Sequence, residues 1–81
     1  MLAITLLSCH EMVFDGPARH VILPGERGVF EVWPCHRPLV SRLLPGLIVV
    51  DERSFPIRRG MVKLTRDTVT ALIEPEPVDE S

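Results

Sequence analysis

The residues best suited to chemistry in this sequence are two cysteines, each followed directly by a histidine: Cys9-His10 and Cys35-His36. A structural zinc site takes its ligands from C-x(2–4)-C or H-x(3–5)-H spacings, because one short loop can then present two ligands to one metal. Adjacent residues of an extended chain point to opposite sides. The two pairs therefore do not favour a metal site, and we expect no metal, no cofactor and no small-molecule ligand.

Nucleophilic catalysis is the second chemistry that a Cys-His pair could support. It requires a stabilised thiolate and a third group that orients the imidazole. Arg37 is near Cys35 in sequence, and Glu31 or Glu11 could orient a histidine. Such a site also needs an oxyanion hole and a cleft, and a chain of 81 residues has little room for a cavity beside its core. We expect no catalytic residue, and a metal or thiol protein is the least favoured alternative.

The charge of the chain is unevenly distributed. The net charge is -2, but residues 1–73 carry nine bases against seven acids, a difference of +2. The four other acids follow in the last eight residues: Glu74, Glu76, Asp79 and Glu80. Tyrosine is absent and the basic residues form no run, so the composition argues against a nucleic-acid partner. An apolar fraction of 46% with 25% charged residues is typical of a folded domain.

The amino terminus shares some features with a targeting segment. Leu6-Leu7-Ser8-Cys9 superficially resembles a lipoprotein cleavage site, but a signal peptide begins with positive charge, and no Lys or Arg precedes Arg19. Thr5 also interrupts the apolar run, and no stretch approaches the roughly 18 apolar residues that span a bilayer. We therefore expect a cytosolic protein without membrane insertion, whose cysteines stay reduced.

Eight prolines and five glycines divide the chain into short segments of strand-like composition. These segments comprise residues 2–7, 18–23, 29–33, 39–44, 47–50, 55–59, 61–65 and 68–74. Short strands separated by Gly and Pro turns are typical of sandwiches and small barrels. The sequence predicts an all-β fold, a small β-sandwich or flattened barrel of about 8–10 short strands.

Alternation of apolar and polar residues predicts which side chains share a face. In residues 68–73, Val69, Ala71 and Ile73 oppose Thr68, Thr70 and Leu72. Residues 47–50 are apolar throughout, which predicts a central strand buried on both sides. We expect one domain over residues 1–74 and a disordered, acidic, Pro-rich tail over residues 75–81.

The order of short motifs resembles the epsilon subunit of F-type ATP synthase, which corresponds to the mitochondrial delta subunit. The resemblance covers about residues 2–74 in the right order, and no single motif would suffice alone. Its motifs are Phe14-Asp15-Gly16; Val21-x-Leu23-Pro24-Gly25-x-x-Gly28-x-Phe30; Pro34-x-His36-x-Pro38-Leu39-x-Ser41-x-Leu43-x-Pro45-Gly46; Phe55-x-Ile57-x-x-Gly60-x-Val62-x-Leu64; and Val69-Thr70-x-Leu72.

This resemblance implies a non-catalytic rotor subunit of the central stalk, which links the gamma subunit to the c ring and helps couple ion flow to ATP synthesis. It implies a place at the cytoplasmic face of the bacterial plasma membrane, peripheral and within the complex. Residues implied to face the c ring are Glu26, Arg27, Val29, Cys35 and His36. Residues implied to face gamma are Ser8 and Ser41. Residues implied to form the core are Phe14, Leu23, Phe30, Leu39, Leu43, Leu64 and Leu72.

Three departures from the family pattern stand out. The family usually has glycine at the positions of Glu31 and Cys35, and residues 50–55 are shorter than the usual hairpin. Most relatives continue into two helices that can inhibit ATP hydrolysis, whereas here a Pro- and Glu-rich stretch follows Ile73. We expect this inhibitory helical arm to be absent. The alternative function is a free-standing small β module for protein interaction.

Overall fold

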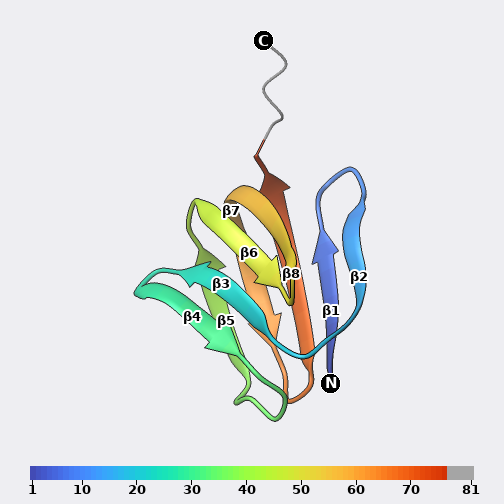
Figure 1. Ribbon diagram of the computed structural model, residues 1–81. Helices are drawn as coiled ribbons and strands as arrows, with labels where there is room; N and C mark the ends of the chain where they lie inside the picture. Colours follow the sequence, from blue (N-terminus) through green and yellow to red (C-terminus); the bar gives the residue numbers. More distant parts are fainter. Residues whose placement is uncertain (77–81) are drawn as a thin grey trace.

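The computed structural model describes residues 1–76, whose regular elements are all strands (Figure 1). These are β1 (Leu2–Leu7), β2 (Met12–Ala18), β3 (Val21–Gly25), β4 (Gly28–Val32), β5 (Leu39–Leu43), β6 (Gly46–Val50), β7 (Arg53–Leu64) and β8 (Thr68–Pro75). The prediction of an all-β fold with about 8–10 short strands is confirmed, since the described residues form eight. None of the described residues forms a helix long and apolar enough to cross a membrane.

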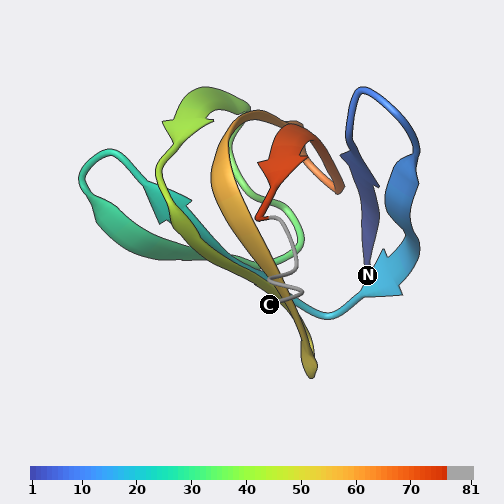
Figure 2. The same ribbon diagram turned by 90° about the horizontal axis from the view of Figure 1, so that it is seen from above.

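The strands form one curved sheet. Five of them lie side by side in the order β2-β1-β8-β7-β5, in which β1 and β8 are parallel and the other pairs antiparallel. The first half of β7 pairs with β6, β6 pairs with β3, and β3 pairs with β4. Because β3 also meets β5 at Gly25 and Leu43, the sheet closes into a flattened barrel. Figure 2 shows the β1–β2 and β3–β4 pairs at opposite sides of it.

The interior of the barrel is purely hydrophobic. No polar side chain is buried among residues 1–76. The alternation predicted for residues 68–73 is confirmed, since Val69, Ala71 and Ile73 point into the core. The buried hydrophobic residues of the core are Leu2, Ile4, Leu6, Ala18, Val21, Leu23, Val32, Leu43, Ile48, Val50, Ile57, Val62, Leu64, Val69, Ala71 and Ile73.

Strand β2 was not foreseen from the sequence. Residues 18–23 were expected to form one strand, but β2 ends at Ala18 and β3 begins at Val21, with a corner at Arg19 and His20. Gly16 and Pro17 make residues 12–18 a poor candidate for a strand. They are tolerated because β2 lies at the edge of the sheet, where one side of the backbone needs no partner.

Gly60 was expected to separate two strands, and this prediction is wrong. Residues 53–64 form the single strand β7, whose register against β8 shifts between Ile57 and Arg59. A Cβ on Gly60 would lie 2.7 Å from the carbonyl oxygen of Leu72, so only glycine lets the two backbones approach so closely. Glycine inside a strand marks such an approach as readily as it marks a turn.

Two predictions about burial also need correction. Leu47 is exposed while Ile48 and Val50 are buried, so β6 alternates instead of being buried on both sides. Among the predicted core residues, Leu39 and Leu72 are exposed. Leu72 is exposed because it alternates with the buried residues of β8. Leu39 is the first residue of β5, a strand in which only Leu43 is fully buried. Leu23, Leu43 and Leu64 are buried as predicted, and Phe14 and Phe30 pack partly buried against the core.

The carboxyl-terminal strand extends slightly beyond the expected domain boundary. Strand β8 includes Pro75, and the backbone N–H of Glu76 donates to the carbonyl oxygen of Pro56 at 3.0 Å. Residues 77–81, which make up the rest of the expected tail, lie outside the described residues. The disorder expected there stays a prediction.

Candidate functional site

The β3–β4 turn carries three of the residues expected to face the c ring: Glu26, Arg27 and Val29. Gly25 and Gly28 pair across the turn, which leaves Glu26 and Arg27 as its tip. Gly28 has a φ of 117°, which side chains rarely tolerate. A Cβ on Gly25 would lie 2.6 Å from the ring of Phe30. The glycines therefore fix the hairpin, and Val29 beside its tip is 72% exposed.

The other two residues of that set, Cys35 and His36, lie in the β4–β5 loop. The backbone N–H of Cys35 donates to Asp67 Oδ1 at 3.1 Å, and that of His36 donates to the carbonyl oxygen of Arg66 at 3.1 Å. Cys35 has a φ of 67°, in the left-handed region that favours glycine. The backbone thus explains why glycine suits this position, and the loop is fastened to the β7–β8 turn.

Ser8 begins the turn between β1 and β2, where its hydroxyl group is fully engaged. Its Oγ accepts from the backbone N–H groups of His10 and Glu11 at 3.2 and 3.1 Å and donates to the carbonyl oxygen of Glu11 at 3.1 Å. Such side-chain to backbone bonds shape turns. Ser8 would therefore serve a partner mainly by holding the turn in shape.

Ser41 lies on β5, and its contacts differ from those of Ser8. It pairs with the buried Val62, so its side chain is on the inner side of the sheet, and its hydroxyl donates to the carbonyl oxygen of Arg42 at 3.0 Å. Ser41 lines a groove of about 760 Å³ between β5 and the β3–β4 turn. Arg42 Nε lies 3.9 Å from Glu26 Oε1 across that groove.

The seven expected contact residues thus fall into three regions. Glu26, Arg27, Val29 and Ser41 share the groove, although the resemblance assigned Ser41 to a different partner from the other three. Figure 1 shows the β1–β2 turn with Ser8 at the top of the molecule and the β4–β5 loop with Cys35 and His36 at the bottom. These assignments to partners stay predictions.

A surface that the sequence did not reveal is a row of apolar side chains across the outer face of the sheet. Register places Met12 opposite Leu7, Leu7 opposite Leu72, and Leu72 opposite Met61. Met12, Leu72 and Met61 are 55%, 58% and 46% exposed. We call Met12, Leu7, Leu72 and Met61 the apolar row. It crosses β2, β1, β8 and β7, and an open pocket of about 430 Å³ beside Met61 and Leu72 also includes Cys9 and Leu44.

The next row of the same face is polar. Asp15, Thr5, Thr70 and Lys63 are neighbours in register, and the Thr5 hydroxyl donates to Asp15 Oδ1 at 3.2 Å. Large exposed apolar groups that gather beside polar ones mark interaction sites more often than scattered ones do. The apolar row is therefore the best candidate docking surface among the described residues.

Charged groups border the apolar row near the end of β8. Arg59 Nε donates to Glu74 Oε2, and Arg58 lies 3.7 Å from the other carboxylate oxygen. The hydrogen bond from Arg59 holds the pKa of Glu74 below its usual value, and the charges of Arg59 and Arg58 act in the same direction. The same hydrogen bond raises the pKa of Arg59. These groups are solvent-exposed, so the pairing orients the margin of the surface more than it stabilises the fold.

The structure also places the two Cys-His pairs. Cys9 and Cys35 are both exposed thiols without a disulfide, in loops at opposite ends of the molecule (Figure 1). Within residues 1–76 no three His, Cys, Asp or Glu side chains gather as metal ligands would. Because the β1–β2 turn and the β4–β5 loop lie at opposite ends of the molecule, one ion cannot take a ligand from each pair in this fold.

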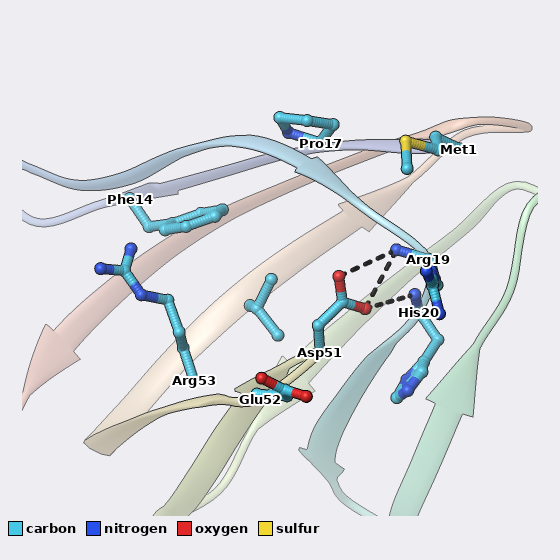
Figure 3. Close-up of a pocket in the computed structure, with 9 residues that line it drawn as sticks. Met1, Phe14, Pro17, Arg19, His20, Asp51, Glu52 and Arg53 are labelled. Atoms are coloured by element: carbon cyan, nitrogen blue, oxygen red, sulfur yellow. Dashed lines mark hydrogen bonds between the residues drawn. The ribbon is translucent and has the colours of Figure 1, made fainter.

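One further pocket lies where the β2–β3 corner meets the β6–β7 turn (Figure 3). The Asp51 carboxylate accepts from the backbone N–H groups of Arg19 at 3.0 Å and His20 at 3.2 Å. Arg53 lies over the ring of Phe14, with its guanidinium carbon 5.7 Å from the ring centre. These groups tie strands together, which explains their arrangement without a ligand.

Glu31 is the second position where the family usually has glycine. It lies on β4, and its side chain contacts the β2–β3 corner at His20. Its carboxylate lies 3.4 Å from Nδ1 of His20, and the His20 ring packs on Trp33 with 4.8 Å between ring centres. The side chain at position 31 therefore contacts this chain's own β2–β3 corner.

Comparison with known proteins addresses the identity of this fold. Residues 1–75 match the family described as "ATP synthase, Delta/Epsilon chain, beta-sandwich domain". The chain belongs to this family. The match includes every described strand, so the predicted resemblance and the predicted β-sandwich are both confirmed.

Curated bacterial relatives support the same assignment. The chain is 32% identical to the ATP synthase epsilon chain of Bordetella parapertussis over 78 residues, covering 90% of this chain and 56% of that one. It is 33% identical to the epsilon chain of Bordetella avium over 76 residues, covering 88% and 54%. The chain thus spans just over half the length of these curated relatives.

Solved structures share the fold at low sequence identity. The mitochondrial ATP synthase of Euglena gracilis, described as OSCP/F1/c-ring in rotational state 1, contains a chain that matches with a TM-score of 0.84 at 20% identity, covering 99% of this chain and 55% of that one. The central stalk and c ring of the Tetrahymena thermophila enzyme contain another, with a TM-score of 0.71 at 15% identity, covering 90% and 63%. These matches extend the fold of the family to distant relatives.

Proposed function

We propose that this chain is a non-catalytic subunit of the central stalk of an F-type ATP synthase. In this role it binds gamma, rests on the c ring and helps to couple ion flow to ATP synthesis. Family membership and the epsilon-chain names of its relatives support the proposal. The observation that carries it is the family match over residues 1–75. The apolar row supplies a surface for a partner, because large exposed apolar groups that gather on one face mark interaction sites.

We assign gamma to the apolar row. Leu72 and Met61 lie in the middle of the five-stranded face, held by ladders on both sides, so they form a rigid surface. Apolar contacts that become fully covered at the centre of an interface supply most of its affinity. Ser8, expected to face gamma, lies in the turn that joins the two strands carrying Leu7 and Met12.

We assign the c ring to the opposite end of the molecule. The β4–β5 loop with His36 lies at the bottom in Figure 1, away from the β1–β2 turn. A subunit that links two partners in a rotor needs two separate surfaces and a stiff body between them. The hydrophobic core and the continuous ladder from β2 to β5 provide that body.

The cellular place follows from the complex. As part of a bacterial synthase, the chain would sit peripherally at the cytoplasmic face of the plasma membrane, held by protein contacts. It would perform no chemistry, since ATP is made by other subunits. The expected absence of an inhibitory helical arm stays a prediction, because the relatives extend beyond the region matched here.

The proposal is tested by binding to the gamma subunit of the same organism. Leu72→Glu should weaken binding at least tenfold, because it places a charge at the centre of the apolar row. Thr70→Glu is the matched control, since Thr70 is an exposed residue on the same strand and face, in the polar row. It should change the dissociation constant less than threefold.

Wild-type chain that fails to bind gamma would contradict the proposal and favour a free-standing interaction module. Equal loss of binding in both variants would show that gamma does not use the apolar row. Circular dichroism of both variants verifies that they remain folded.

A further inference from the structure

His20 carries a ring nitrogen whose hydrogen-bonding capacity the fold leaves unused. Its Nδ1 atom is buried and makes no hydrogen bond within residues 1–76. Glu31 Oε2 lies only 3.4 Å from this nitrogen. A polar atom removed from water without a partner costs free energy, so an unpaired one in a folded protein requires an explanation.

The proton content of the ring decides what this contact does. A neutral imidazole carries one N–H, so in one of its two tautomers Nδ1 and the Glu31 carboxylate are both acceptors and repel one another. An imidazolium donates from both nitrogens, and its Nδ1–H then forms a charge-assisted hydrogen bond to the carboxylate. Histidine is the side chain suited to this change of charge between about pH 5 and 8.

The charged groups around the β2–β3 corner come from the corner itself, from β4, from the β6–β7 turn and from β7. They are Arg19, Glu31, Asp51, Glu52 and Arg53. The Asp51 carboxylate accepts from the backbone N–H groups of Arg19 and His20, which it does whatever the charge of the ring. Arg53 lies on the far side of Asp51 from His20 (Figure 3). Within residues 1–76, Glu31 alone forms an ion pair with the His20 ring.

We infer that His20 and Glu31 form a proton-dependent latch, which fastens edge strand β4 to the β2–β3 corner when the imidazole is charged. Among the described strands β4 pairs only with β3, so one side of its backbone has no partner strand. The latch gives β4 a second attachment through a side chain. Loss of the proton leaves this strand held by its ladder to β3 and by side-chain packing.

Trp33 makes the state of the latch measurable. Its ring packs on the His20 ring with 4.8 Å between ring centres, and it is the single tryptophan of the chain. A charged imidazole quenches tryptophan fluorescence more strongly than a neutral one does. The emission of Trp33 therefore reports the charge of His20.

This inference goes beyond the proposed function and does not depend on it, because the latch consists of contacts within this chain. The two ends of β4 are the β3–β4 turn and the β4–β5 loop, so the latch sets how firmly both are held. The apolar row lies on β2, β1, β8 and β7 and is not part of this attachment. Acid should therefore stiffen one edge of the sheet and leave the row as it is.

The first test is a double-mutant cycle of His20→Gln and Glu31→Gln, measured by chemical denaturation at about pH 5.5 and about pH 8. The coupling, expressed as a ratio of unfolding equilibrium constants, should be about threefold larger at the lower pH. The factor is modest because the two side chains are 24% and 44% exposed and water screens the pair. Glu52→Gln is the matched control, since it removes a carboxylate from the same corner and should show no coupling with His20→Gln.

The second test follows the latch without unfolding the chain. Wild-type Trp33 emission should fall as the pH is lowered from about 8 to about 5, and His20→Gln should abolish the fall. Over the same range the hydrogen-exchange protection factors of the β4 amides bonded to β3 should rise about threefold in wild type and stay constant in Glu31→Gln. Should His20→Gln fail to fold, the exchange of Glu31→Gln decides alone.

Three results would overturn the inference. One is a coupling between positions 20 and 31 that is equal at both pH values. Another is protection of β4 that rises equally in wild type and Glu31→Gln. The third is an equal coupling of Glu52→Gln with His20→Gln, which would assign the effect to the general charge of the corner. Since all measurements use the isolated chain, failure to bind gamma would contradict the proposed function and leave the latch standing.

Discussion

The apolar row and the β4–β5 loop are built in opposite ways. The side chains of the row project from strands hydrogen-bonded on both sides, except on edge strand β2, so their spacing is fixed by the ladder. The β4–β5 loop is a connecting segment, joined to the β7–β8 turn by two hydrogen bonds. Hydrophobic contact on a rigid face supplies affinity, whereas charged contact on loops mainly sets orientation and association rate. The difference suggests a permanent contact at one surface and a steered contact at the other.

The largest effect should come from breaking the ladder beneath the row. Gly60→Ala places a Cβ 2.7 Å from the Leu72 carbonyl oxygen, which is backbone and cannot move aside cheaply. We expect a loss of about 2–3 kcal/mol in the free energy of unfolding, measured by urea denaturation. Gly16→Ala is the control, because its Cβ would meet the nearest atom at an ordinary 3.5 Å. A loss below about 0.5 kcal/mol for Gly60→Ala would contradict the close approach.

Loosening the loop should affect the other surface alone. Asp67→Ala removes the acceptor of the Cys35 N–H and should cost about 0.5–1.5 kcal/mol of stability, with faster hydrogen exchange at Cys35. Binding to gamma through the row should be unchanged. Asp15→Ala removes a comparable exposed acceptor on β2 and should leave the exchange of Cys35 as it was. Unchanged slow exchange of the Cys35 amide in the Asp67→Ala variant would show that the hydrogen bond from Cys35 to Asp67 does not hold the loop.

A smaller gain should follow from restoring glycine in the loop. Cys35→Gly relieves the left-handed backbone at this residue, and the gain is partly offset by the entropy of glycine in the unfolded chain. We expect net stabilisation of about 0.5–1 kcal/mol in chemical denaturation. Cys9→Gly, at a residue without positive φ, should give no gain. Equal effects of the two substitutions would show that the backbone of Cys35 is not strained.

The smallest effect concerns the charges that border the row. The folded-state pKa of Glu74 lies below its unfolded value, so the stabilising contribution of this group is present above the unfolded pKa and is lost as the pH falls through the folded value. Melting temperatures of wild type and Glu74→Gln should therefore differ slightly at pH 7 and converge in acid. A difference that grows as the pH falls would have the wrong sign for this pair.

Local sequence signals predicted the turns and much of the core. Gly25 and Gly28 fix a hairpin by local geometry, and the alternation of Val69, Ala71 and Ile73 needs only the period of a strand. The prolines around His36 predicted a loop, because proline restricts the local backbone whichever strands pair on either side of it.

Surfaces that depend on register could not be predicted in this way. Met12 and Met61 become neighbours of Leu7 and Leu72 only after four strands have paired, and no spacing in the sequence encodes that. Leu72 was even assigned to the core, since a large apolar residue in a motif favours burial.

The parallel pairing of β1 with β8 has a consequence for how the protein is made. Ala3 lies opposite Thr68, so β1 pairs with β2 early but finds its second partner only when β8 has been made. A chain that ends before residue 68 contains Leu7, Met12 and Met61 but lacks β8, which joins Met61 to the Leu7–Met12 pair. The apolar row is therefore completed only when β8 has paired, so a partial chain without β8 cannot present this surface to a partner.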